Sequence, residues 1–116
     1  MTSDTTKDEW SVWMAQVMFD DGIRSKERPV VVLSDRVVLC ICMGVTSKYK
    51  GRDFGYKLKK WEYAGLTNES WVRFEYLELK HDMFRRRVGM LHDDDIQGIQ
   101  DWLNDLAHGN RKYSLR

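Results

Sequence analysis

The sequence predicts a mostly β fold, a small and mostly antiparallel barrel or curled sheet with one C-terminal α-helix. Two observations lead to this prediction. Several short runs rich in valine, cysteine and aromatic residues are separated by turn-forming residues, and only the last segment repeats apolar residues at helical spacing. The 116 residues, 42% of them hydrophobic, suffice for one domain with its own core. We expect that domain over 9–107, after a flexible lead at 1–8 and before a polar tail at 108–116.

The expected strands cover 9–19, 30–33, 37–43, 56–59, 70–77 and 86–91, and a helix follows from Asp93 or Asp94 to about Ala107. Pro29 is the only proline and pushes Arg28 toward extended backbone. Arg28 is therefore expected at the entrance of the second strand, where a polar loop meets the sheet. The third strand is expected to end at Gly44 and Val45, which leaves Thr46 and Ser47 at its exit.

Two elements show clear periodicity. In the segment 70–77, alternation is expected to turn one set of side chains toward the core, namely Val72, Phe74 and Tyr76. The opposite face then carries Trp71, Arg73 and Glu75. The helix has an apolar stripe with Trp102 beside it, formed by Ile96, Ile99, Leu103 and Leu106.

Charge is distributed unevenly along a chain whose net charge is only +1. The segment 48–60 holds six basic residues and one acid, interleaved with Tyr49, Phe54 and Tyr56. Cations follow phosphates and aromatic rings stack on bases, so this segment is expected to bind single-stranded nucleic acid. A solvated loop is the alternative. No apolar run approaches the ~20 residues of a membrane span, and the polar start lacks the pattern of a secretion signal, so a cytoplasmic location is expected.

Few residues carry an obvious chemical signature. Cys40 and Cys42 fall on one strand face and are expected to be ordinary buried cysteines rather than zinc ligands. The segment 92–95 (His-Asp-Asp-Asp) is explained by helix capping, with a cation site as the lesser alternative. His81 and His108 stand alone and are expected at the surface. Arg73 and Glu75 share a strand face and either flank a phosphodiester or form a surface salt bridge.

Four sequence blocks, in this order, resemble the PemK/MazF toxins of type II toxin–antitoxin systems. The resemblance spans roughly residues 10–106 and depends on Ser25–Leu33 with its Arg-Pro pair, Val45–Lys48, Ala64–Leu66 ahead of Ser70–Glu75, and Arg87–Leu91 before the helix. Glutamate stands at position 75 where aspartate is usual in this family. Ile23 or Arg24 stands where some members have a histidine, and Glu78 replaces an arginine.

The resemblance implies an SH3-like barrel that pairs as a homodimer and inhibits growth as an mRNA interferase, cutting single-stranded RNA without a metal or other cofactor. It assigns catalytic roles to Arg28, Thr46, Ser47, Arg73 and Glu75. RNA-binding roles are expected for Arg24, Lys26, Lys48, Tyr49, Lys50, Arg52 and Trp71. A cognate antitoxin is the implied protein partner, and its acidic or apolar segment would cover the basic groove.

The expected reaction starts from the 2′-hydroxyl of the RNA and yields a 2′,3′-cyclic phosphate and a 5′-hydroxyl. Glu75 is the expected base, helped either by partial burial against Trp71 or by the neighbouring arginines. Arg28 and Arg73 would hold the phosphate oxygens while charge builds on them. The group that protonates the departing 5′-oxygen stays open, because arginine is a poor proton donor.

Two other functions are compatible with the sequence. One is a non-catalytic toxin or binding module on the same barrel, such as a CcdB-like gyrase inhibitor or an RNA binder. The other is a structural interaction domain without toxicity. The joint presence of Arg28, Thr46, Arg73 and Glu75 favours the nuclease, because a pure binder does not need all four.

Overall fold

The structure is a computed structural model and describes residues 7–18, 24–48 and 55–107. The elements in chain order are β1 (Ser11–Met18), β2 (Ser25–Asp35), β3 (Leu39–Thr46), β4 (Gly55–Lys57), β5 (Trp71–Lys80), the 3-10 helix η2 (His81–Met83), β6 (Phe84–Met90) and α1 (Asp93–Ala107). The mostly β class with one C-terminal helix is thus confirmed. Residues 1–6 of the lead expected at 1–8, and the whole tail expected at 108–116, lie outside the described residues.

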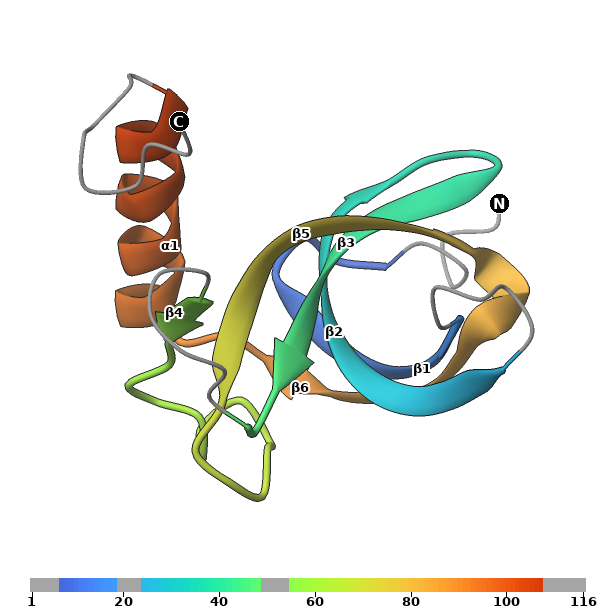
Figure 1. The fold of residues 1–116 in the computed structure, drawn as a ribbon, viewed down its shortest axis with the longest axis horizontal. Helices are drawn as coiled ribbons and strands as arrows, with labels where there is room; N and C mark the ends of the chain where they lie inside the picture. The colour runs from blue at the N-terminus through green and yellow to red at the C-terminus, as the bar shows by residue number, and fades with distance from the viewer. Residues whose placement is uncertain (1–6, 19–23, 49–54, 108–116) are drawn as a thin grey trace.

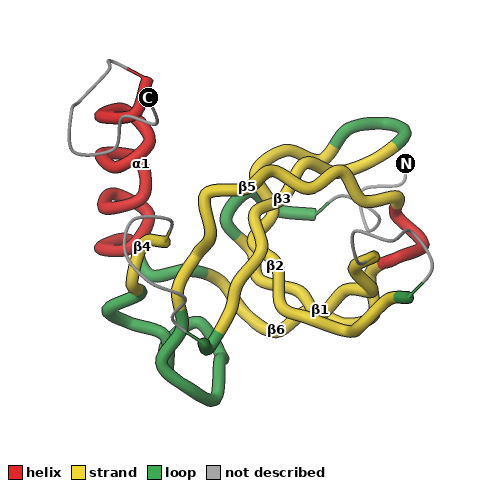
Figure 2. The backbone as a smooth tube through the Cα atoms, viewed as in Figure 1, coloured by secondary structure: helices red, strands yellow, loops and turns green. Residues whose placement is uncertain are grey.

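The strands form one antiparallel sheet in the order β4-β5-β3-β2-β1-β6. The sheet curls so strongly that β1, β2, β3, β5 and β6 surround a common centre, while α1 lies on one side of it, beside β4 (Figures 1 and 2). No pairing between β5 and β6 is found in the described part of the chain, and η2 joins these two strands instead. The fold is therefore a curled sheet in which η2 connects β6, at one edge, to β5, the strand next to the other edge.

Strand β2 is buried on both faces at its centre. Val30, Val31 and Val32 are all fully buried, although neighbouring side chains of a strand point to opposite faces. Val30 and Val32 pack with Cys40 and Cys42 in one cluster, and Val31 packs in a second cluster that includes residues of α1. This double covering explains why the run shows no alternation in the sequence.

The bounds of β2 and β3 differ from the sequence-based expectation. β2 begins at Ser25, so Arg28 lies inside the strand, paired with Ala15 of β1, and not at its entrance. At the other end, Val37 and Val38 are 95% and 71% exposed in the β2–β3 hairpin turn, where a strand was expected. β3 ends at Thr46, one residue beyond the expected end at Gly44 and Val45, so Ser47 alone follows the strand.

Strand β5 changes its buried face partway along. Val72 is buried as expected, but Tyr76 is 57% exposed and Leu79 is buried instead. The register with β3 jumps from the pair Met43–Tyr76 to the pair Val45–Val72, so β5 bulges between them. A bulge bends its strand and redirects side chains. The expected core position of Tyr76 is therefore wrong, and the bulge contains Arg73 and Glu75.

Helix α1 is anchored to the segment after β4 by one buried carboxylate. Asp95 has no exposed surface and accepts hydrogen bonds from the backbone N–H groups of Lys59 (2.9 Å) and Lys60 (2.8 Å) and from the Tyr56 hydroxyl (3.0 Å). Burial, and next the hydrogen bond to Asp95, raise the pKa of Tyr56 above its ordinary value. On the apolar side of the helix, Ile99 and Trp102 are buried in the core. The side chain of Leu106 is not among those that the structure describes.

Candidate active site: a basic cleft at the end of β3

A gap opens in the sheet beside Arg28. β2 pairs with β1 from Ser25 onward, but in the described chain it pairs with β3 only from Val30 onward. Pro29 has no backbone N–H to donate, and prolines are tolerated where a strand lacks a neighbour on one side. The backbone at Arg28 and Pro29 therefore borders an opening between β2 and the last residues of β3.

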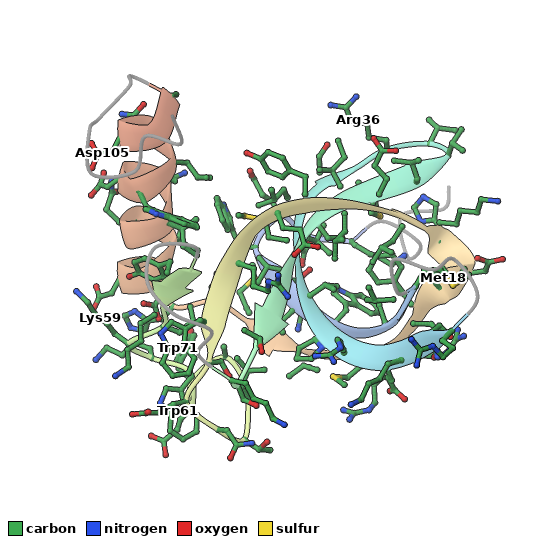
Figure 3. The ribbon with its side chains drawn as sticks, in the orientation of Figure 1. Met18, Arg36, Lys59, Trp61, Trp71 and Asp105 are labelled. Atoms are coloured by element: carbon green, nitrogen blue, oxygen red, sulfur yellow. The ribbon has the colours of Figure 1, made fainter. Side chains whose placement is uncertain are left out.

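This opening is a cleft of about 630 Å³ that receives side chains from β1, β2, β3 and β5. Its lining includes four of the five expected catalytic residues, namely Arg28, Thr46, Arg73 and Glu75. Two expected RNA-binding residues, Arg24 and Lys48, line it as well. Met18, labelled in Figure 3, contributes to the apolar part of the lining at the end of β1. Segments that are distant in the sequence thus meet around one space.

The cleft is strongly basic. Its described lining residues include four cations, Arg24, Arg28, Lys48 and Arg73, against a single acid, Glu75. Arg73 Nε lies 3.2 Å from Glu75 Oε1, and the two side chains are 50% and 43% exposed. An ion pair this exposed contributes at most ~1 kcal/mol, so a bound phosphate can compete for the arginine. The cleft is suited to an anionic ligand.

Glu75 gains its chemical environment from arginine rather than from burial. Its side chain is 43% exposed beside Arg73, and Trp71 does not line the cleft. Trp71 instead lies half-buried on the β4 side, where the Lys57 ammonium is 5.8 Å from its ring (Figure 3). Of the two expected ways to assist Glu75 as a base, only the neighbouring arginines are in place.

The hydroxyl of Thr46 is held at the point where β3 ends. Thr46 Oγ1 accepts a hydrogen bond from the backbone N–H of Lys48 at 3.1 Å, which fixes the first turn after the strand. Ser47 does not line the cleft but a neighbouring hollow of about 340 Å³. Tyr49, Lys50 and Arg52, which belong to the basic segment 48–60, lie outside the described residues.

The neighbouring hollow continues the cleft on the other side of Arg28 and Thr46, because both residues line both spaces. It adds Lys26, which was expected to bind RNA, and Arg86 of β6, which was not. Arg86 reaches this place because β6 pairs with β1, with Arg86 opposite Met14. No local sequence signal separates Arg86 from its neighbours Arg85 and Arg87.

The two cysteines are not activated nucleophiles. Both are free and fully buried, as expected. Burial is the largest cause that raises the pKa of Cys40 to about 11 and that of Cys42 to about 12. Because the thiolate is the reactive form, neither thiol is reactive at neutral pH.

Comparison with protein families places nearly the whole chain in one of them. Residues 8–107 match the family model described as PemK-like, MazF-like toxin of type II toxin–antitoxin system. A comparison with curated proteins gave no match. None of the described helices is both long and apolar enough to cross a membrane. The family match covers the four strands that build the cleft, and the chain belongs to the PemK/MazF family of toxins of type II toxin–antitoxin systems.

Proposed function

We propose that this protein is an endoribonuclease that cuts single-stranded RNA at the basic cleft without a metal ion. Members of its family are typically mRNA interferases. The observation that carries the proposal is the meeting of Arg28, Thr46, Arg73 and Glu75 around one cleft. Two guanidinium groups, a hydroxyl and a carboxylate are the groups that an internal attack by a ribose 2′-hydroxyl requires.

The proposed reaction uses Glu75 as the general base. RNA supplies the nucleophile, so the protein has only to remove the 2′-hydroxyl proton and stabilise the charge that develops on the phosphate. A phosphate that enters the cleft takes over Arg73 from its exposed ion pair with Glu75. The Glu75 carboxylate is then released toward the 2′-hydroxyl of the same nucleotide.

Arg28 and Arg73 are proposed to hold the non-bridging phosphate oxygens. They approach from different strands, β2 and β5, and a guanidinium donates forked hydrogen bonds that strengthen as negative charge accumulates. Thr46 adds a hydroxyl donor from the end of β3. As the 2′-oxygen bonds to phosphorus, the bond from phosphorus to the 5′-oxygen breaks, and the 5′-oxygen leaves with the electron pair and takes a proton from water. The products are a 2′,3′-cyclic phosphate and a 5′-hydroxyl. DNA lacks the 2′-hydroxyl and is expected to bind without being cut.

The path of the RNA is proposed to cross from the cleft into the neighbouring hollow. Arg24 and Lys48 contact phosphates on the cleft side, and Lys26 and Ser47 contact the strand in the hollow. Tyr49, Lys50, Arg52 and Trp71 are proposed to bind further nucleotides. A homodimer would extend this groove with a second copy of it. Membership of a type II toxin family implies an antitoxin partner, and a segment that covers these cations would block RNA.

The test is cleavage of single-stranded RNA by the purified protein in EDTA. Arg28→Ala is expected to lower the rate about 10²- to 10³-fold, as loss of a charge-stabilising donor does. Glu75→Gln is expected to lower it at least 10²-fold, as loss of a general base does. Thr46→Val should cost about tenfold. A 2′-deoxy oligonucleotide of the same sequence should remain intact.

Matched controls come from exposed residues outside both spaces. Glu78→Gln changes an exposed carboxylate of the same strand as Glu75, and Arg85→Ala removes an exposed arginine that bonds to the Asp82 carbonyl. Both variants should cut at the wild-type rate. Cleavage that needs a divalent metal would overturn the mechanism. Wild-type cleavage rates in Arg28→Ala, Glu75→Gln and Thr46→Val would overturn the assignment of the site. Tight RNA binding without any cleavage would favour the binding module.

A further inference from the structure

A cluster of side chains with metal-binding donor atoms lies away from the cleft. Asp35 is the last residue of β2, Cys40 follows the first residue of β3, and His81 begins η2. One donor atom from each of the three residues lies within 4.8 Å of the other two. None of the three lines the cleft or the neighbouring hollow. His81, expected from the sequence to stand alone at the surface, is therefore part of a group.

The spacing of the donor atoms fits a tetrahedral zinc site. Cys40 Sγ lies 3.5 Å from Asp35 Oδ1 and 3.8 Å from His81 Nδ1. Zinc–sulfur bonds of about 2.3 Å and zinc–nitrogen or zinc–oxygen bonds of about 2.1 Å place tetrahedral ligands roughly 3.4 to 3.6 Å apart. The two distances from Cys40 Sγ are within a few tenths of an ångström of that separation. Asp35 Oδ1 also lies 3.4 Å from the other ring nitrogen of His81, Nε2.

The imidazole of His81 is already oriented as a ligand. His81 Nε2 lies 2.8 Å from the carbonyl oxygen of Arg36, and because a carbonyl only accepts, Nε2 carries the proton. The lone pair of Nδ1 is left on the side of the Cys40 sulfur. Histidines that bind metals usually donate their other ring N–H to a carbonyl or carboxylate in this way.

The cluster also attracts a cation from the chain itself. The Lys7 ammonium lies 3.3 Å from His81 Nδ1 and over the rings of Trp13 (5.3 Å) and Phe84 (4.6 Å). The backbone N–H of Lys7 donates to the second oxygen of Asp35, Oδ2, so Oδ1 is the oxygen that faces Cys40. A metal ion would displace the flexible lysine side chain while its backbone contact remains.

A catalytic cysteine is the other interpretation of such a group, and the surroundings disfavour it. Cys40 is fully buried, which keeps its sulfur from a substrate, and the nearest nitrogen of His81, Nδ1, is 3.8 Å from that sulfur and only 3.3 Å from the Lys7 ammonium. The side chains of His81 and Asp35 are 33% and 10% exposed, so a small ion can enter where a large substrate cannot. Sulfur, imidazole and carboxylate together are a donor set typical of Zn²⁺.

We propose that Asp35, Cys40 and His81 form a Zn²⁺ site, with water as the fourth ligand, that ties the β2–β3 hairpin to η2. Zn²⁺ binds the Cys40 thiolate, and the thiol proton is released to solvent on binding. Binding holds together the region where β5 passes into β6 without strand pairing. The site stabilises the fold and takes no part in RNA cleavage. The proposal is therefore independent of the proposed function, and cleavage in EDTA does not bear on it.

The test adds Co²⁺ or Zn²⁺ to the purified full-length protein. Co²⁺ should bind one equivalent with a thiolate-to-metal charge-transfer absorption, and Zn²⁺ should displace it. At a free Zn²⁺ concentration of 100 times the Kd, Tm should rise by about 10 °C and return to its starting value on chelation. Cys40→Ser and His81→Asn should abolish both signals. Lys7→Met should bind the metal more tightly, because the competing ammonium is gone.

Two matched variants serve as controls. Cys42→Ser removes the other buried thiol of β3, and His92→Asn removes a histidine whose partner is Asp94. Both should bind Co²⁺ like the wild type. A wild-type Co²⁺ spectrum without the thiolate band would overturn the proposal even if a variant fails to fold. Loss of binding in Cys42→Ser or His92→Asn, with binding retained in His81→Asn, would overturn it as well.

Discussion

Two carboxylates in this protein have opposite surroundings. Glu75 lies in the β5 bulge with 43% of its side chain exposed, and its ion pair is with Arg73. Asp95 lies in the first turn of α1 with no exposed surface, and three hydrogen bonds from protein donors satisfy it. The oxygens of Asp95 bind only donors of the fold itself, whereas those of Glu75 can still accept hydrogen bonds from a substrate.

Buried and exposed carboxylates in this fold are stabilised in different ways. Where a carboxylate is buried, backbone N–H groups stabilise it by hydrogen bonds, as those of Lys59 and Lys60 do for Asp95. Where the sheet is interrupted, at Arg28 and in the β5 bulge, charged side chains are held by strands yet remain solvated. Such a position suits a residue that must exchange one partner for another during a reaction.

The largest effect that would test this contrast is the loss of the Asp95 carboxylate. Asp95→Ala leaves two backbone N–H groups and the Tyr56 hydroxyl without their acceptor. Each unsatisfied buried group costs about 1–3 kcal/mol, so the free energy of unfolding should fall by about 3–5 kcal/mol. Urea denaturation measures this change.

Glu75→Gln is the matching substitution at the exposed carboxylate. Its free energy of unfolding should change by less than about 0.5 kcal/mol, because the ion pair with Arg73 is solvated. The contrast fails if Asp95→Ala costs under 1 kcal/mol or if Glu75→Gln destabilises the protein as strongly as Asp95→Ala does.

The sequence predicts the elements better than it predicts their mutual placement. Strands and helix follow from local alternation and periodicity, and the resemblance to the PemK/MazF family brings together Arg28, Thr46, Arg73 and Glu75. The exposed position of Tyr76 follows from a register shift with β3, which no local pattern indicates. The contacts of Asp95 with the segment after β4 likewise depend on how α1 docks.

The same limit applies to the clusters. Arg86 joins the hollow beside the cleft through the pairing of β6 with β1, and His81 meets Cys40 through the course of β5 and η2. Both groups are formed by residues that are far apart in the chain, so the spacing of residues in the sequence does not predict either of them. The Pro29 signal gave the correct extended backbone for Arg28 but not its position within β2.

A substitution of Arg86 is expected to have an effect of intermediate size, because Arg86 is an exposed charged residue of the hollow beside the cleft. If the RNA crosses from the cleft into the hollow, Arg86→Ala should weaken RNA binding about tenfold and leave the unfolding free energy nearly unchanged. The slope of log K against log salt should become shallower by about 0.7, the value for one phosphate contact on a single strand. Arg87→Ala is the matched control, because Arg87 lines neither the cleft nor the hollow and its Nη2 lies 3.8 Å from Asp8 Oδ2. An unchanged salt slope in Arg86→Ala would place the RNA elsewhere.

The smallest effect concerns the hydroxyl that Tyr56 donates to Asp95. Tyr56→Phe removes one hydrogen bond to the buried carboxylate and should lower the unfolding free energy by about 1 kcal/mol at pH 7. In the folded protein, burial and Asp95 raise the pKa of Tyr56, whereas the unfolded phenol ionises near pH 10. The unfolded state therefore loses its proton first, and the stabilisation by Tyr56 should decline as the pH rises above about 10.

Urea unfolding of the wild type and Tyr56→Phe between pH 7 and 11 measures this decline. Other groups that titrate in this range are present in both proteins and cancel in the difference. The two unfolding free energies should converge above pH 10, because only the wild type contains the phenol that ionises on unfolding. A difference that stays constant up to pH 11 would mean that neither burial nor the hydrogen bond to Asp95 raises the pKa of Tyr56 in the folded protein.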